Sequence, residues 1–120
     1  KSAITYLVLH NNHIACRGAQ QLASALQYNQ TVKHMILSKN QLSDDGLSCL
    51  LMRLQQDHVL ETLVCSQNGC TDACLPTVIH WLSKTTTLKR FYIEENKFKH
   101  KGYIALLKEV CKQKNIILKF

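Results

Sequence analysis

The stretch Met35-Ile36-Leu37-Ser38-Lys39-Asn40-Gln41-Leu42 decides the fold, because its pattern returns along the chain at a fixed interval. Its asparagine recurs every 28 residues, without insertion or deletion, across four copies. A period of this length is typical of repeat proteins, in which each copy is one supersecondary unit that packs on its neighbours. The recurring residues are Asn12, Asn40, Asn68 and Asn96.

Each copy combines a strand pattern with a helix pattern. Before each asparagine, the residues alternate with a period of two, as in Tyr6-Leu7-Val8-Leu9-His10, so that one side chain in two points inward. This pattern predicts a short strand. After it, apolar residues follow helical spacing and predict a helix with one buried stripe, which in the last copy is Tyr103, Leu106, Leu107 and Val110. The 120 residues are therefore predicted to form one domain, with repeats at about 4–31, 32–59, 60–87 and 88–115 and a strand stub at 116–120.

Polar residues at the corners of each copy are predicted to serve the backbone. An asparagine amide both donates and accepts hydrogen bonds, so a stacked column of asparagines can satisfy turn groups that helix and sheet leave unpaired. Asp44-Asp45 and Thr71-Asp72 come directly before two helices, where their oxygens are predicted to accept from free N–H groups.

This pattern resembles the leucine-rich-repeat family, and the 28-residue period resembles its ribonuclease-inhibitor-like subtype. The segments Leu63-Val64-Cys65-Ser66-Gln67-Asn68 and 35–42 stand where that family has its strand and asparagine turn, and the likeness extends from about Ile4 to Phe120. The resemblance implies an α/β solenoid, a right-handed βα superhelix with a parallel concave sheet and convex helices. It also implies a non-enzymatic module that binds a protein partner through the concave face.

Side chains that point outward from the predicted strands form three rows across the concave face. The middle row is aliphatic and aromatic, a composition typical of the centre of a protein interface. The β-propensity of Val, Ile and Tyr explains the same row without a partner, so both interpretations stay open. The predicted binding residues are Tyr6, His34, Thr62 and Arg90 in the first row, Val8, Ile36, Val64 and Tyr92 in the middle row, and His10, Ser38, Ser66 and Glu94 in the third row.

The excess of basic residues is confined to the end of the chain. Of 15 Lys and Arg residues, 10 lie from Lys84 onward, together with 3 of the 8 acidic residues. An alternative function is therefore an electrostatic tether that binds an acidic partner, nucleic acid or an anionic membrane. A polar cap on a terminal repeat explains the same lysines, and no groove-reading motif supports nucleic acid. The predicted basic patch is Lys97, Lys99, Lys101, Lys108, Lys112 and Lys114.

Two constellations suggest chemistry that the repeat phase argues against. Cys65, Cys70 and Cys74, with His80 nearby, carry donors that zinc uses, but the cysteines occupy core or glycine positions of the repeat, so no metal or cofactor is predicted. A Ser-His-acid relay needs contacts of about 3 Å, whereas His10 and Glu94 would lie on strands roughly 14 Å apart, so no enzyme is predicted.

Compartment and assembly follow from weaker signals. Six cysteines are too few for a disulfide-stabilised miniprotein and favour reduced thiols in the cytoplasm, although a secreted effector stays open. Ile116, Ile117, Leu118 and Phe120 are predicted to form an exposed strand edge. An edge-to-edge dimer and a place within a longer repeat chain therefore both stay open, and the sequence does not identify the partner.

Overall fold

The computed structural model of the chain describes residues 4–54 and 59–120, so the end of the second predicted repeat, 55–58, lies outside the described residues. Strands and helices alternate along the chain as predicted. Within the described residues no helix combines the length and apolar character needed to cross a membrane. The elements are β1 (Tyr6–Val8), α1 (Cys16–Leu26), β2 (His34–Ile36), α2 (Ser43–Arg53), β3 (Thr62–Val64), η1 (Asp72–Cys74), α3 (Leu75–Lys84), β4 (Arg90–Tyr92), α4 (Lys101–Gln113) and β5 (Ile117–Lys119).

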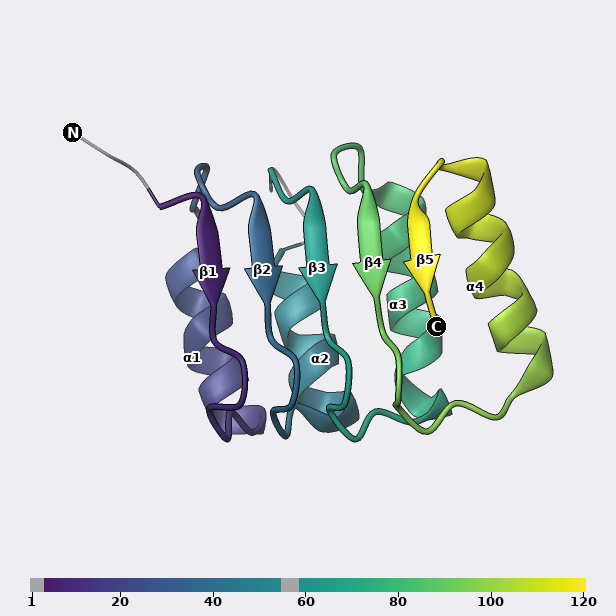
Figure 1. Ribbon diagram of the computed structural model, residues 1–120, viewed down its shortest axis with the longest axis horizontal. Coiled ribbons are helices and arrows are strands. Elements are labelled where there is room, and N and C mark those ends of the chain that lie inside the picture. The colour runs from purple at the N-terminus through teal and green to yellow at the C-terminus, as the bar shows by residue number, and fades with distance from the viewer. Residues whose placement is uncertain (1–3, 55–58) are drawn as a thin grey trace.

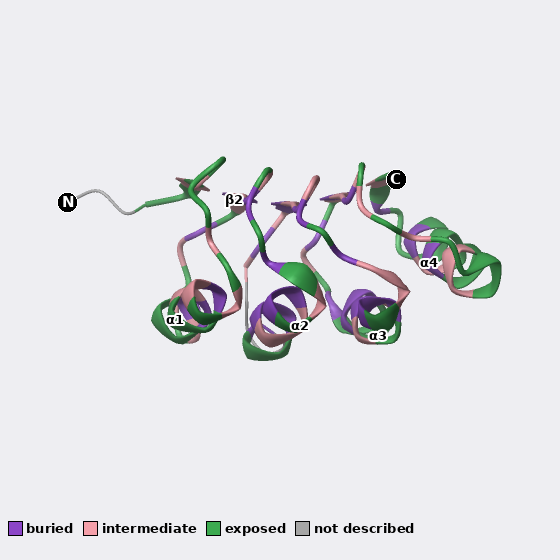
Figure 2. Cartoon of the chain, turned by 90° about the horizontal axis from the view of Figure 1, so that it is seen from below, coloured by how far each residue is buried: buried purple, intermediate pink, exposed green. Residues whose placement is uncertain are grey.

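The strands form one parallel sheet in the order β1-β2-β3-β4-β5 (Figure 1). Its register follows the repeat, because Leu7 pairs with Met35, Met35 with Leu63, and Leu63 with Phe91, each a step of 28 residues. The last step shortens to 27, because Phe91 pairs with Leu118. Figure 2 shows the strands in one layer and the helices in the other, which confirms the predicted α/β solenoid with its helices on the convex side.

The core lies between these two layers. The central residues of the inner strands, Met35, Leu63 and Phe91, are almost wholly buried, whereas their strand neighbours face the other way. Trp81 of α3 is also buried, with its ring centroid 6.4 Å from that of Phe91 and its indole N–H donating to the carbonyl of Leu54 at 3.4 Å. Removal of this apolar surface from water is the main force that holds helices to sheet.

Asparagine side chains join each turn to the turn of the neighbouring repeat. Oδ1 of Asn40 accepts from the backbone N–H groups of Asn12 and Ile14, both at 2.9 Å. Its Nδ2 donates to the carbonyls of Leu9 and Leu37, also at 2.9 Å. Asn96 repeats the arrangement, accepting from Asn68 and Cys70 and donating to Cys65 and Ile93.

The corner also requires left-handed backbone at the residue before each asparagine. These residues have φ between 53° and 58°, although none is glycine. Such a conformation costs an L-residue roughly 1–2 kcal/mol, so the surrounding hydrogen bonds must hold it in place. The four positions are Asn11, Lys39, Gln67 and Glu95.

Aspartates form a second set of links between repeats, which corrects one prediction. Asp44 does not cap its own helix, and α2 has no side-chain cap. Its carboxylate accepts from the backbone N–H and the hydroxyl of Thr71 in the next repeat, at 2.6 and 2.5 Å. Asp72 likewise accepts from the N–H groups of Lys99 and His100, at 2.8 and 3.1 Å. The prediction was right for Thr71, whose hydroxyl accepts from the N–H of Ala73 at the start of η1.

Repeat positions that are buried in the middle of the solenoid differ in exposure at the ends. Leu106 was predicted to belong to the buried stripe of α4 but is 53% exposed, whereas Leu50 and Val78 at the same repeat position are fully buried. No further helix packs on the outer side of α4 within the described residues. Ile116 was predicted to be exposed but is only 6% exposed, because it packs against the core just before β5 begins.

We expect Asn40→Ala to lower the free energy of unfolding by about 3 kcal/mol, because it leaves backbone groups of two turns without partners in a buried site. Asn12→Ala is the matched control, since Asn12 is exposed and its amide donates to the carbonyl of His10. That control should change the value by no more than about 0.5 kcal/mol. Urea unfolding of both variants checks this, and equal effects would contradict a bridging role for Asn40.

We expect Asp72→Asn to lower the urea midpoint at neutral pH. The N–H groups of His100 and Lys99 hold the pKa of Asp72 below its usual value. Because the folded pKa is the lower one, this stabilisation is present above the usual aspartate pKa of about 3.9 and is lost as the pH falls through the lowered value. The two midpoints should therefore converge in acid. The exposed Asp45 provides the control Asp45→Asn, and an equal pH response in both variants would assign the effect to general charge.

Candidate functional site

The register of the sheet brings the predicted binding residues to one surface, which we call the strand face. Tyr6, His34, Thr62 and Arg90 are direct partners across neighbouring strands, and so are Val8, Ile36, Val64 and Tyr92. The pairing continues beyond the strands, because Asn11, Lys39 and Gln67 donate their N–H groups to the carbonyls of Ser38, Ser66 and Glu94. His10, Ser38, Ser66 and Glu94 therefore form the third row, one residue from each repeat.

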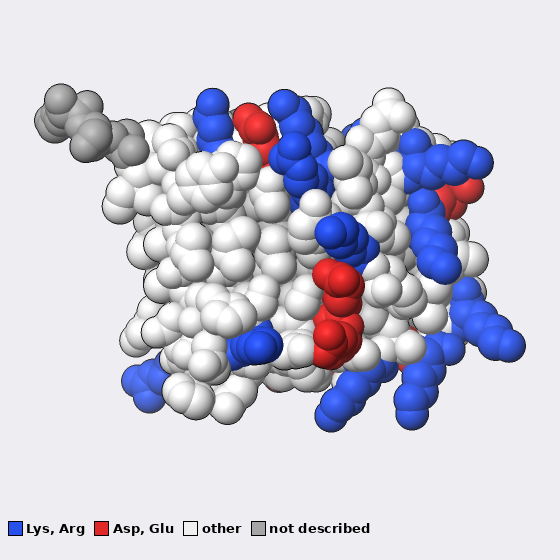
Figure 3. All heavy atoms as spheres, in the orientation of Figure 1, with Lys and Arg blue, Asp and Glu red and all other residues white. Residues whose placement is uncertain are grey.

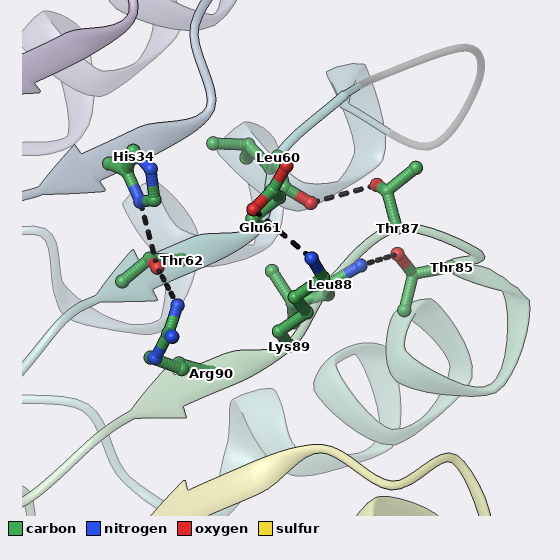
Figure 4. Close-up of polar contacts among 9 residues, drawn as sticks. All are labelled: His34, Leu60, Glu61, Thr62, Thr85, Thr87, Leu88, Lys89 and Arg90. Atoms are coloured by element: carbon green, nitrogen blue, oxygen red, sulfur yellow. Dashed lines mark hydrogen bonds and ion pairs between the residues drawn. The ribbon is translucent and has the colours of Figure 1, made fainter.

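The first row is a continuous chain of contacts, one ring stack followed by two polar contacts. The rings of Tyr6 and His34 stack with centroids 4.2 Å apart. Nδ1 of His34 lies 2.9 Å from Oγ1 of Thr62, and Nη1 of Arg90 donates to the same oxygen at 3.3 Å (Figure 4). These neighbours leave Thr62 only 7% exposed. The sequence placed these residues in one row, but periodicity carries no information on the rotamers that let them touch.

The middle row is an apolar strip on the side opposite the helices. Val8 is 59% exposed, and Ile36, Val64 and Tyr92 are each partly exposed. Neighbouring strands lie about 4.8 Å apart, so the four side chains are close enough to cover one another's flanks. At its far end the strip meets a charge, because Nζ of Lys119 lies 4.7 Å from the centroid of the Tyr92 ring.

The third row does not assemble a catalytic relay. His10 follows β1 and Glu94 follows β4, so three strand intervals, roughly 14 Å, separate them. A general base must lie within hydrogen-bonding distance of the group it deprotonates. This arrangement offers polar contacts to a ligand but no nucleophile paired with a base.

Charge is unevenly spread over the molecule. Figure 3 shows the strand face largely uncharged toward the N-terminal side, with Lys and Arg gathered toward the α4 side. Directly before β3 and β4, Nζ of Lys89 lies 3.5 Å from Oε1 of Glu61 (Figure 4). Two lysines of the basic patch are used within the fold, because Lys114 donates to the carbonyl of Thr85 at 3.0 Å and Nζ of Lys108 lies 5.6 Å from the Phe120 ring centroid. The other patch lysines, Lys97, Lys99, Lys101 and Lys112, lie in the loop before α4 or on α4.

The cysteine cluster is part of the core. Donor atoms of Cys70 and Cys74 lie within 4.8 Å of each other and of an Asp44 oxygen, and His80 is not in this group. The Cys70 thiol donates to the carbonyl of Ser43 at 3.5 Å and the Cys74 thiol donates to that of Thr71 at 3.3 Å.

Thiolates are the form that binds metal, and this surrounding disfavours them. Burial raises the pKa of Cys65 to about 12 and that of Cys111 to about 11. The pKa of Cys74 is raised as well, first by its hydrogen bond with Cys70 and then by burial. Within the group, Cys74 is therefore held as a neutral thiol, and Cys70 and Cys74 are both buried as packing residues.

Comparison with known proteins agrees with this geometry. A family model described as "Leucine Rich repeat" matches residues 28–51, which include β2 and most of α2. No curated protein sequence matches the chain. Among solved structures, "Leiomodin-1 Actin-Binding Site 2 (ABS2)" is similar, with 15% sequence identity, a TM-score of 0.70, and coverage of 92% of this chain and 80% of that chain. The fold is thus a leucine-rich-repeat solenoid. Together, the repeat match and the fold support a leucine-rich-repeat protein.

We expect a thiol reagent to label Cys16 and Cys49 in the folded chain, because these two are partly exposed whereas Cys65, Cys70, Cys74 and Cys111 are buried. Burial both blocks access and keeps a thiol protonated, and the thiolate is the reactive form. Mass spectrometry of the labelled chain, with and without denaturant, checks this. Labelling of Cys70 or Cys74 at the rate of Cys49 in the folded chain would contradict the core assignment.

Proposed function

We propose that this chain is a non-enzymatic protein-interaction module that binds a protein partner through the strand face. The observation that carries the proposal is the solvent-facing row Val8, Ile36, Val64 and Tyr92. Core packing does not require apolar side chains on the side away from the helices, whereas interfaces are apolar at their centres. The similar structure is named as a binding site for actin, another protein, which is compatible with this type of partner.

The surroundings of the middle row favour binding in two ways. Tyr and Arg are the residue types that dominate interface energies, and Tyr6, Tyr92 and Arg90 all lie on this face. The contacts of His34, Thr62 and Arg90 hold the first row in one arrangement before a partner arrives. Ordering of side chains is a cost of association, and a row that is already ordered reduces it.

We further propose that the chain is of the ribonuclease-inhibitor-like subtype and works in the cytoplasm. The 28-residue register step between β1 and β4 supports the subtype. Six cysteines without a disulfide among them fit a reducing compartment.

The basic patch supports a second candidate, an electrostatic tether for an acidic partner, nucleic acid or anionic membrane. Figure 3 shows its positive charges gathered at the α4 end of the molecule. The two candidates differ in salt dependence, because contacts of exposed lysines weaken as ions screen them, whereas burial of an apolar row does not.

Affinity capture identifies candidate partners, and the test is made with a purified one. We expect Tyr92→Ala to weaken binding at least about 30-fold, the loss typical of an interface hot spot. Tyr28→Ala is the matched control, because Tyr28 is 83% exposed and lies outside the rows, in the connection between α1 and β2. Three results would instead favour the tether: binding is lost in Lys108→Glu with Lys112→Glu, it weakens steeply as salt rises, and it does not respond to Tyr92→Ala.

A further inference from the structure

The strand face changes character at β4. The nine face residues carried by the first three repeats, from Tyr6 to Ser66, include no Lys, Arg, Asp or Glu. Among the residues of the three rows, the charged ones are Arg90 and Glu94 of the fourth repeat, and Lys119 of β5 lies beside them, paired with Tyr92. An uncharged surface therefore ends at a short border of charges.

Arg90 is fixed but not neutralised. One nitrogen of its guanidinium donates to Oγ1 of Thr62, which is itself held by His34 (Figure 4). Among the described residues, no carboxylate lies within ion-pair distance of Arg90, since the nearby Glu61 pairs with Lys89. The remaining N–H donors keep the planar fork that matches a carboxylate.

Lys119 supplies a second cation beside it. Its Nζ sits over the Tyr92 ring at 4.7 Å, and no described carboxylate pairs with it. Arg90 pairs with Ile117, two residues before Lys119 on the neighbouring strand, so the two cations are diagonal neighbours on the strand face, with Arg90 held toward Thr62 and Lys119 over Tyr92. Glu94 lies two residues beyond Tyr92, on the side away from Arg90, and repels a carboxylate there. A bound segment should therefore place its carboxylate on the Arg90 side of Tyr92.

We propose that the partner presents a protein segment that places an apolar side chain on Ile36 and Val64 and, next to it, a carboxylate between Arg90 and Lys119. This inference rests on the proposed function of the strand face and adds the chemistry of the partner. An apolar strip bordered by two unpaired cations suits an apolar segment with an adjacent Asp, Glu or C-terminal carboxylate. A phosphate backbone is a poorer match, because it would lay charge across the uncharged rows.

The test is selection of random displayed peptides on the full chain. The selected peptides are then synthesised in two forms. The acidic form has the selected sequence, and in the amide form Asp and Glu become Asn and Gln and the C-terminal carboxylate is amidated. The affinity of each form for the chain is measured by fluorescence anisotropy. We expect the acidic form to bind about tenfold more tightly than the amide form, and Arg90→Gln with Lys119→Gln to remove this difference while the amide form still binds. Thermal melting of the variant checks that it remains folded.

Lys101→Gln with Lys112→Gln is the matched control, because it removes the same charge from the basic patch and should leave the tenfold preference intact. Loss of the preference in this control, but not in the Arg90 and Lys119 variant, overturns the inference. So does equal binding of the acidic and amide forms, or competition by an oligothymidylate as strong as that by the peptide. In all these cases continued sensitivity to Tyr92→Ala leaves the proposed function standing, whereas selected peptides that bind Tyr92→Ala unchanged overturn both.

Discussion

The side-chain amide of an asparagine, shared between the turns of two repeats, is the interaction on which the structure depends. Asn40 accepts from two backbone N–H groups of the first repeat and donates to carbonyls on both sides of the boundary. A corner of this kind is neither helix nor strand, so its backbone groups would otherwise be buried without partners, at a large energetic cost. Parallel strands can therefore follow one another after short helices without leaving the backbone groups of the turns unpaired.

The same ladder determines the surface that faces a partner. Because it fixes the offset between neighbouring repeats, equivalent residues fall opposite one another in the sheet, and a residue type that recurs in sequence becomes a row in space. The chemistry of the strand face is thus built one repeat at a time, with polar contacts in the first row, apolar side chains in the middle row and a charged border where β4 and β5 meet.

Periodicity predicts what repeats and not what varies between copies. The strands, the helices, the buried face and the membership of the three rows all follow from offsets that recur along the chain. The links from Asp44 and Asp72 to the next repeat could not be predicted, because an acidic residue at a helix start has an adequate local role as a cap. The exposure of Leu106 has a similar origin, since its environment depends on a neighbouring helix and not on its own position in the pattern.

The left-handed corner at Asn11, Lys39, Gln67 and Glu95 has a consequence for how such a module can diversify. Elsewhere this backbone conformation often demands glycine, but here the neighbouring amides impose it, and four different side chains adopt it. The fold therefore does not restrict the side chain at the corner position, which can be a cation, an anion or a neutral amide. A scaffold with this property can acquire new charge along one margin by single substitutions, while its architecture stays the same.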